Sequence, residues 1–180
     1  DYLSDVEREQ PMKSEQLSVA IVGVLARVKA GYVHSLFHNG HNKNLKVHLY
    51  GPQFEPEGEN ENLIYHGAFP PEELASHIEG DFGLIWDGTE ASTCAGNTGE
   101  YLKYNNPHKA SMYLSAGMPV IVWSQAAIAD FVLSNRVGLT VDSLYEIEDK
   151  IKSISDTEYE QMCDNVKKIS EKLREGFYTK

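Results

Sequence analysis

The 180-residue sequence has few cysteines, no cluster of basic residues and no long apolar run, and each shortage excludes a class of protein. Its two cysteines, Cys94 and Cys163, lie far apart and form no CxxC pair, so the sequence supports neither a thiol redox motif nor a zinc ribbon. Acidic residues outnumber lysine and arginine by 27 to 16, which gives a formal net charge of −11. Because nucleic acid is bound by clustered Lys and Arg, it is a poor partner for this chain.

The apolar runs also exclude a membrane span. The run at residues 19–25 is far shorter than the ~20 residues that a membrane-spanning helix needs, and no signal peptide is recognisable before it. We therefore predict a protein that is not transmembrane and is cytoplasmic, with a peripheral association with the membrane left open.

The length fits one ordinary domain with a real apolar core and no need for disulfides or metals. Residues 1–16 mix charged residues and proline with scattered apolar positions, which is typical of a linker or strap. The folded domain is expected to span residues 17–180. Because the sequence begins at Asp1 and not at methionine, we expect it to be a piece of a longer protein.

Short β-rich apolar runs alternate with helical patterns along the chain. Strands are predicted at residues 18–24, 45–50, 63–65, 82–86, 119–123 and 138–141. Helices are predicted at residues 32–38, 72–78, 108–116 and 126–133, followed by one long amphipathic helix through residues 159–173. Continuously apolar strands are expected where both faces of a parallel sheet are covered. The predicted fold class is α/β, a Rossmann-like doubly wound parallel sheet.

Two loops are longer than this scheme requires. Residues 52–62 are acidic and contain proline, which predicts a solvated excursion. Residues 87–106, rich in Gly, Thr and Asn, leave the carboxyl end of a strand. Ligands bind outside those strand ends in open α/β sheets, so the second loop is the better candidate for a functional element.

The segment at residues 106–121 is the most informative part of the sequence. It places Lys109 at the start of a short predicted helix. Gly117 is predicted to end that helix, and a buried strand is predicted to begin at Pro119. A cation and the free backbone N–H groups of a helix start converge there. This arrangement suits an anion such as a pyrophosphate.

The same segment resembles a known signature. The order Pro-x-Lys, three residues, then Tyr-Leu-x-x-Gly-x-Pro-Val-Ile in residues 107–121 resembles the donor-binding signature of GT-B glycosyltransferases. The segments at residues 49–52, 64–69 and 101–104 are similar to the bacterial galactofuranosyltransferase-like and glucosyltransferase group. The resemblance covers about residues 18–175.

The resemblance implies the C-terminal, donor-binding domain of a GT-B glycosyltransferase of polysaccharide biosynthesis. The implied donor is a UDP-sugar carrying galactofuranose, glucose or a similar sugar, and the acceptor is a glycan or glycoconjugate. In such enzymes the acceptor side, often with the catalytic base, belongs to the N-terminal domain, which we expect to lie outside this sequence. The catalytic base is therefore unknown, and the domain alone is expected to be inactive. No metal and no cofactor are expected, and a homo-oligomer of the full-length enzyme is left open.

Cations are the first candidate ligands for the donor diphosphate. The resemblance implies that Lys109 binds a phosphate and that the turn beginning at Gly23 contacts the diphosphate through Arg27. A guanidinium can bind two phosphate oxygens together, so Arg27 ranks above Lys29. The alternative for each residue is an ordinary exposed charge.

The base of the nucleotide is expected at two other strand ends. The turn at His66, Gly67 and Phe69 lies where related enzymes hold the base, and Gly67 permits close approach. Tyr50 ends the second predicted strand and is a candidate for the same reason. The alternative is a plain strand-to-helix turn with Phe69 in the core.

The remaining candidates surround the signature. Asn106 and His108 could contact phosphate or sugar, or could stabilise the loop. Met112 occupies a position at which many GT-B enzymes have a glutamate that binds ribose, and methionine cannot accept those hydrogen bonds. The ribose ligands are then sought in the long loop, which offers Thr98, Glu100 and Lys103.

Other functions were weighed against this one. His34 and His38 share a helix face with His41 nearby, but no acidic or cysteine partner stands at motif spacing, so scattered histidines are favoured over a metal site. GxGxxG and GxSxG are absent, which gives no support to NAD or FAD binding or to a serine hydrolase. Two alternatives stay open, a nucleotide-sugar epimerase domain and a non-catalytic docking domain of a transferase.

Overall fold

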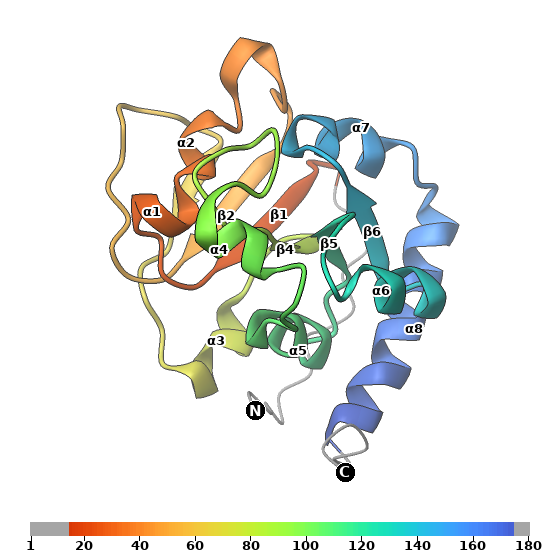
Figure 1. Cartoon of the computed structure of the whole chain (residues 1–180). Helices are drawn as coiled ribbons and strands as arrows, with labels where there is room; N and C mark the ends of the chain where they lie inside the picture. Colours follow the sequence, from red (N-terminus) through yellow and green to blue (C-terminus); the bar gives the residue numbers. More distant parts are fainter. Residues whose placement is uncertain (1–14, 175–180) are drawn as a thin grey trace.

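The computed structural model describes residues 15–174, which fold into a six-stranded sheet covered by helices on both faces (Figure 1). The predicted linker at residues 1–16 lies almost wholly outside the described residues. The strands are β1 (Ser18–Val22), β2 (Lys46–Tyr50), β3 (Leu63–Tyr65), β4 (Phe82–Ile85), β5 (Val120–Trp123) and β6 (Gly138–Val141). The helices before β5 are α1 (Arg27–Ala30), α2 (Tyr32–Ser35), η1 (His38–Gly40), α3 (Pro71–His77), α4 (Gly96–Tyr101) and α5 (His108–Ser115). Those after it are α6 (Ala129–Asn135), η2 (Leu144–Glu146), α7 (Ile147–Lys152) and α8 (Asp156–Arg174).

The sheet has the order β3-β2-β1-β4-β5-β6, and all of its pairings are parallel. Consecutive strands run outward from β1 to β3, after which the chain returns to the centre and runs the other way from β4. The order therefore reverses between β1 and β4, where ligands bind in folds of this kind. This arrangement confirms the predicted fold class.

Burial explains why the strands were readable from the sequence. Every residue of β4 and β5 is buried, because helices cover both faces of the sheet. In Figure 1, α1, α2 and α7 lie on one side and α3, α5 and α8 on the other. The predicted apolar stripe of α8 packs on its own domain through the buried residues Tyr159, Cys163, Val166 and Ile169, next to α5.

The helix predicted at residues 32–38 was wrong in its bounds. Of that range, α2 covers only residues 32–35, and the 3-10 turn η1 follows it. Gly31 separates α2 from α1, and each of these two helices is four residues long. Sequence reasoning also missed α4 and α7. The first predicted strand extends too far, because Gly23 at φ +126° turns the chain away after Val22.

Candidate active site

A cavity of about 480 Å³ lies at the carboxyl ends of β1, β2 and β4, at the point where the strand order reverses. Its floor includes Val22 and Tyr50, and Asp87 follows β4 on its wall. The segment around α4 contributes Thr98, and the start of α5 contributes Lys109. The predicted functional loop thus borders the cavity, although it contains a helix.

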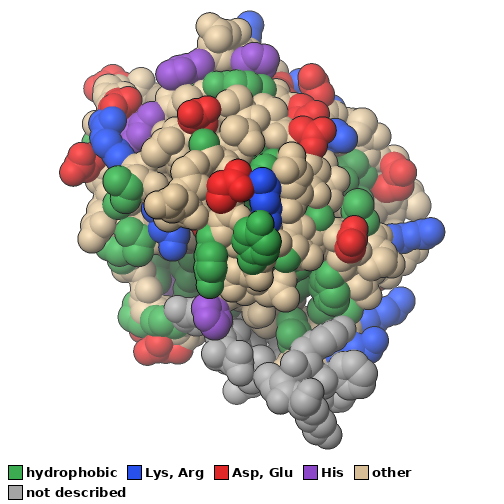
Figure 2. Space-filling view, in the orientation of Figure 1, with side chains coloured by type: hydrophobic (Ala, Val, Ile, Leu, Met, Phe, Trp, Pro, Cys, Tyr) green, Lys and Arg blue, Asp and Glu red, His purple; other side chains and the backbone are tan. Residues whose placement is uncertain are grey.

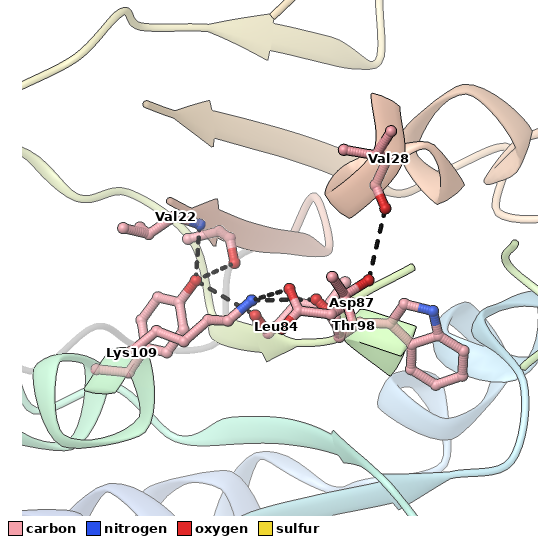
Figure 3. A network of polar contacts seen from close by, with 9 residues as sticks. Val22, Val28, Leu84, Asp87, Thr98 and Lys109 are labelled. Atoms are coloured by element: carbon pink, nitrogen blue, oxygen red, sulfur yellow. Dashed lines mark hydrogen bonds and ion pairs between the residues drawn. The ribbon is translucent and has the colours of Figure 1, made fainter. Parts of the chain in front are cut away.

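Lys109 lies at the sheet edge where the sequence predicted it. Its Nζ donates to the carbonyl oxygen of Trp86 at 3.1 Å and to Oδ1 of Asp87 at 2.9 Å (Figure 3). The side chains of Lys109 and Asp87 are only 14% and 12% exposed. No side chain caps α5, whose preceding residue is Pro107. The ammonium and the helix start therefore face the same cavity, with a carboxylate beside them.

Arg27 points away from this arrangement. It is 53% exposed and forms ion pairs with Glu57 and, at 3.7 Å, with Glu55, both from the acidic segment. The hydrogen bond from Arg27 is the main reason why the pKa of Glu57 lies below its ordinary value. Lys29, two residues further on, lines the cavity and Arg27 does not. The ranking of Arg27 above Lys29 as a phosphate ligand stays a prediction, but the geometry favours Lys29.

Two glycine turns come very close together at the cavity floor. Gly23 and Gly51 both line the cavity, and a Cβ on Gly51 would overlap the carbonyl oxygen of Gly23. Both have positive φ, +126° and +144°. The N–H of Gly23 donates to the carbonyl of Tyr50 at 3.0 Å, and the N–H of Gly51 donates to that of Gly67 at 2.8 Å. Gly67 therefore supports the floor from outside the cavity wall.

Part of the cavity lining is apolar or aromatic. This part includes Tyr50, Ala68, Phe69, Pro71 and Leu74. The ring of His66 stacks on that of Tyr50 with centroids 4.5 Å apart. Ala68 and Phe69, from the segment 66–69 that was predicted to hold the nucleotide base, thus line the cavity.

The other predicted residues divide into two groups. His108, Thr98 and Met112 line the cavity, whereas Asn106 does not and its neighbour Asn105 does. Lys103 lies outside the cavity lining, where it pairs with Glu100 at 2.7 Å and sits 5.3 Å from the ring centroid of Trp123.

Tyr113 is a residue of the signature whose importance sequence reasoning missed. Its hydroxyl accepts from the N–H of Val22 at 2.9 Å and lies within donating distance of the carbonyl oxygens of Ala20 at 3.0 Å and Leu84 at 3.4 Å. Figure 3 shows Val22 and Leu84 on the facing ends of β1 and β4. The ring packs directly on Gly83, where a Cβ would overlap it. Tyr113 thus joins the two strands at the point where they diverge.

Asp87 was also missed, although a signal for it existed. It is a polar residue directly after a continuously apolar strand, and such residues gather at the ligand-binding edge of a parallel sheet. Its pairing with a lysine 22 positions later was not readable from the sequence.

His34 and His41, considered above as parts of a metal site, make other contacts. His34 lies 3.6 Å from Glu57 and stacks on Phe54, while His41 stacks on Tyr145. Within residues 15–174 no group of three His, Cys, Asp or Glu side chains could hold a metal ion. Cys94 is buried, and that burial raises the pKa of its thiol to about 12, so it is not a thiolate at neutral pH. Among the described helices, none has the length and apolarity to cross a bilayer.

Apolar side chains also gather outside the cavity. Figure 2 shows them around α1 and α4, whereas lysines and arginines are scattered over this face. The exposed apolar residues of these two regions and of the chain beside them are Val24, Val28, Tyr101 and Tyr104. Val24 and Tyr101 also line the cavity.

The parallel sheet with its reversal of strand order defines a doubly wound, Rossmann-like α/β domain, with a cavity and Lys109 outside that reversal. Residues 28–180 match the family described as the glucosyltransferase 3-like, C-terminal domain. The chain belongs to this family. The predicted resemblance to GT-B glycosyltransferases is thereby confirmed.

Individual relatives agree with this assignment. The chain is 38% identical over 181 residues to the β-1,6-galactofuranosyltransferase WbbI of Escherichia coli K12, covering 99% of the chain and 52% of that protein. It is 36% identical over 131 residues to glucosyltransferase 3 of Streptococcus gordonii, covering 71% of the chain and 38% of that protein. The chain thus spans about half or less of the length of these relatives.

Solved structures show the same fold at low identity. The glycosyltransferase WaaG of lipopolysaccharide biosynthesis superposes with a TM-score of 0.56 at 15% identity, over 89% of this chain and 44% of that one. A sucrose-phosphate synthase from Thermosynechococcus elongatus superposes with a TM-score of 0.55 at 13% identity, over 92% of this chain and 47% of that one. At these identities the likeness concerns the fold alone.

Proposed function

We propose that this chain is the donor-binding half of a bacterial glycosyltransferase and that its cavity holds the nucleoside diphosphate of a UDP-sugar. The supporting observation is a cavity at the strand-order reversal whose lining includes both cations and an apolar group. Lys109, at the start of α5, and Lys29 provide the cations, and Phe69 belongs to the apolar group. A nucleoside diphosphate needs both, cations for its phosphates and an apolar surface for its aromatic base.

The diphosphate is placed at the start of α5. A phosphate oxygen there receives a hydrogen bond from the Lys109 ammonium and accepts from the first backbone N–H groups of the helix. During transfer, negative charge grows on the leaving diphosphate, and a fixed cation beside it lowers the barrier. The base is placed against Phe69, whose ring is supported by that of Tyr50 with centroids 6.1 Å apart.

The transfer reaction itself is proposed for the longer protein. WbbI is named as a β-1,6-galactofuranosyltransferase, and the streptococcal relative as a glucosyltransferase. Galactofuranose or glucose is therefore proposed as the transferred sugar, with a glycan or glycoconjugate as acceptor. The acceptor side and the catalytic base are assigned to the part of the enzyme outside this chain.

Titration calorimetry with UDP tests the proposed donor site. Wild-type chain is expected to bind UDP, and Lys109→Ala and Lys109→Gln are expected to lose binding while their melting temperatures without ligand remain measurable. Lys152→Ala is the matched control, because Lys152 pairs with Glu148 outside the cavity lining and its loss should leave affinity unchanged. Equal affinity of wild type and both Lys109 variants would refute the assignment.

A further inference from the structure

Asp87 is an acidic residue in a cavity that we assign to a diphosphate. It follows β4 after one intervening residue, Trp86, and its side chain is 12% exposed. Its Oδ1 accepts a hydrogen bond from Lys109 Nζ at 2.9 Å (Figure 3). A carboxylate in this place repels a phosphate, so its presence calls for a compensating role.

The geometry of the lysine ammonium indicates that role. An ammonium has three N–H donors in a tetrahedral arrangement. Two are directed at fixed acceptors, the carbonyl oxygen of Trp86 at 3.1 Å and Oδ1 of Asp87 at 2.9 Å. With two N–H groups held, the tetrahedral geometry fixes the direction of the third, on a residue that lines the cavity.

The two acceptors differ in what they can do alone. The Trp86 carbonyl belongs to the backbone directly after β4, but one hydrogen bond leaves a lysine free to rotate about that contact. A lysine side chain that becomes fixed only on binding a ligand loses its rotamer freedom at that moment, which weakens binding. Asp87 provides the second fixed point, so the rotamer entropy is already lost before the ligand arrives.

We infer that Asp87 is the positioning residue for Lys109, orienting the lysine so that its remaining N–H meets a phosphate oxygen of the donor. This inference rests on the proposed donor site. The opposing possibility is that Asp87 acts chiefly as a competitor, neutralising Lys109 until a phosphate displaces it. The two roles predict opposite effects on affinity when the carboxylate is removed.

The experiment compares Asp87→Asn and Asp87→Ala by UDP titration calorimetry on the chain. Asparagine keeps an oxygen that accepts from Nζ, and alanine removes it. For a positioning residue, Asp87→Ala weakens UDP binding by about tenfold, the equivalent of one hydrogen bond to a charged group, and Asp87→Asn restores most of it. If Asp87 only competes with phosphate, both variants bind UDP more tightly than wild type, and the inference is overturned.

Controls separate a positioning effect from damage to the fold and from failure of the site. Glu148→Gln removes a carboxylate that pairs with Lys152, outside the cavity lining, and it should leave affinity unchanged. Rescue by asparagine is not expected of a merely structural charge pair, because the ion pair is lost in both variants. If wild type does not bind UDP, the proposed function fails. If wild type binds, Lys109→Gln does not, and both Asp87 variants bind as wild type does, only the positioning role fails.

Discussion

The hydroxyl of Tyr113 offers a quantitative test of how the site is held together. It is buried, accepts from the N–H of Val22 and lies within donating distance of two carbonyl oxygens. Tyr113→Phe keeps the ring on Gly83 and removes only the hydroxyl, so the Val22 N–H loses its partner. Leaving a buried donor unsatisfied costs about 1–3 kcal/mol, and because Val22 is half-buried and lines the cavity we expect a loss near the lower end, about 1 kcal/mol. In a chain of this size each kcal/mol lowers the melting temperature by about 2–4 °C.

Urea unfolding followed by circular dichroism measures the change. The matched control is Tyr159→Phe. The hydroxyl of Tyr159 donates to the carbonyl oxygen of Asp81, the residue before β4. That substitution leaves a carbonyl, and not an N–H, without this bond, so we expect a smaller loss of stability. Tyr113→Phe with wild-type stability, or with a smaller loss than Tyr159→Phe, would refute the view that Tyr113 holds β1 and β4 together.

Three further outcomes are expected. Gly83→Ala should destabilise the fold by about 1–3 kcal/mol in urea unfolding, because its Cβ overlaps the Tyr113 ring; stability equal to wild type would show that the ring can move. In UDP titrations Lys29→Ala should weaken binding more than Arg27→Ala, since only Lys29 lines the cavity; the reverse order would restore Arg27 as the ligand. Burial raises the pKa of Glu148, but hydrogen bonds from Lys152 and Asn44 outweigh it and hold that pKa below the ordinary 4.5. Because the folded pKa is depressed, the carboxylate stabilises the fold fully above about pH 4.5 and less as pH falls below it. Glu148→Gln should therefore be less stable than wild type at pH 7, by a margin that shrinks in acid unfolding experiments; a margin independent of pH would contradict this.

The strands of the sheet were predictable because their positions depend on local patterns. Residues 63–65 and 138–141 are strands with the predicted bounds, and the all-buried β4 and β5 read as continuous apolar runs. Helix α7 was predictable in principle and was missed. It follows a capping box in which Ser143 and Glu146 satisfy each other's backbone groups, a pattern that sequence alone displays.

Helix α4 could not be predicted from local patterns. Its residues Gly96 to Gly99 are poor helix formers, and the helix forms where the chain packs closely on the end of β4. A Cβ on Gly99 would overlap the backbone of Cys94 and approach that of Asp87. Close packing of this kind depends on contacts that only the folded chain makes.

The site was predictable as a region and not as a set of contacts. Lys109, His108 and Phe69 border the cavity as predicted, because the ends of parallel strands gather at one edge. The partners of the cations could not be predicted. Arg27 faces Glu57 and Lys109 faces Asp87, and both pairs join segments that are far apart in the sequence.

The net charge leads to a last prediction, on salt. A chain with a formal charge of −11 repels a diphosphate at long range, and this repulsion is screened at ~0.15 M salt, where the Debye length is about 8 Å. The contact with Lys109 is short and sheltered, with the lysine side chain 14% exposed, so salt screens it much less. UDP affinity should therefore stay level or rise as NaCl increases from ~10 to ~150 mM, the range over which the long-range repulsion is removed. A steep fall over that range, as in proteins that hold phosphates with exposed basic patches, would mean that the diphosphate is bound by surface cations such as Arg27 and not in the cavity.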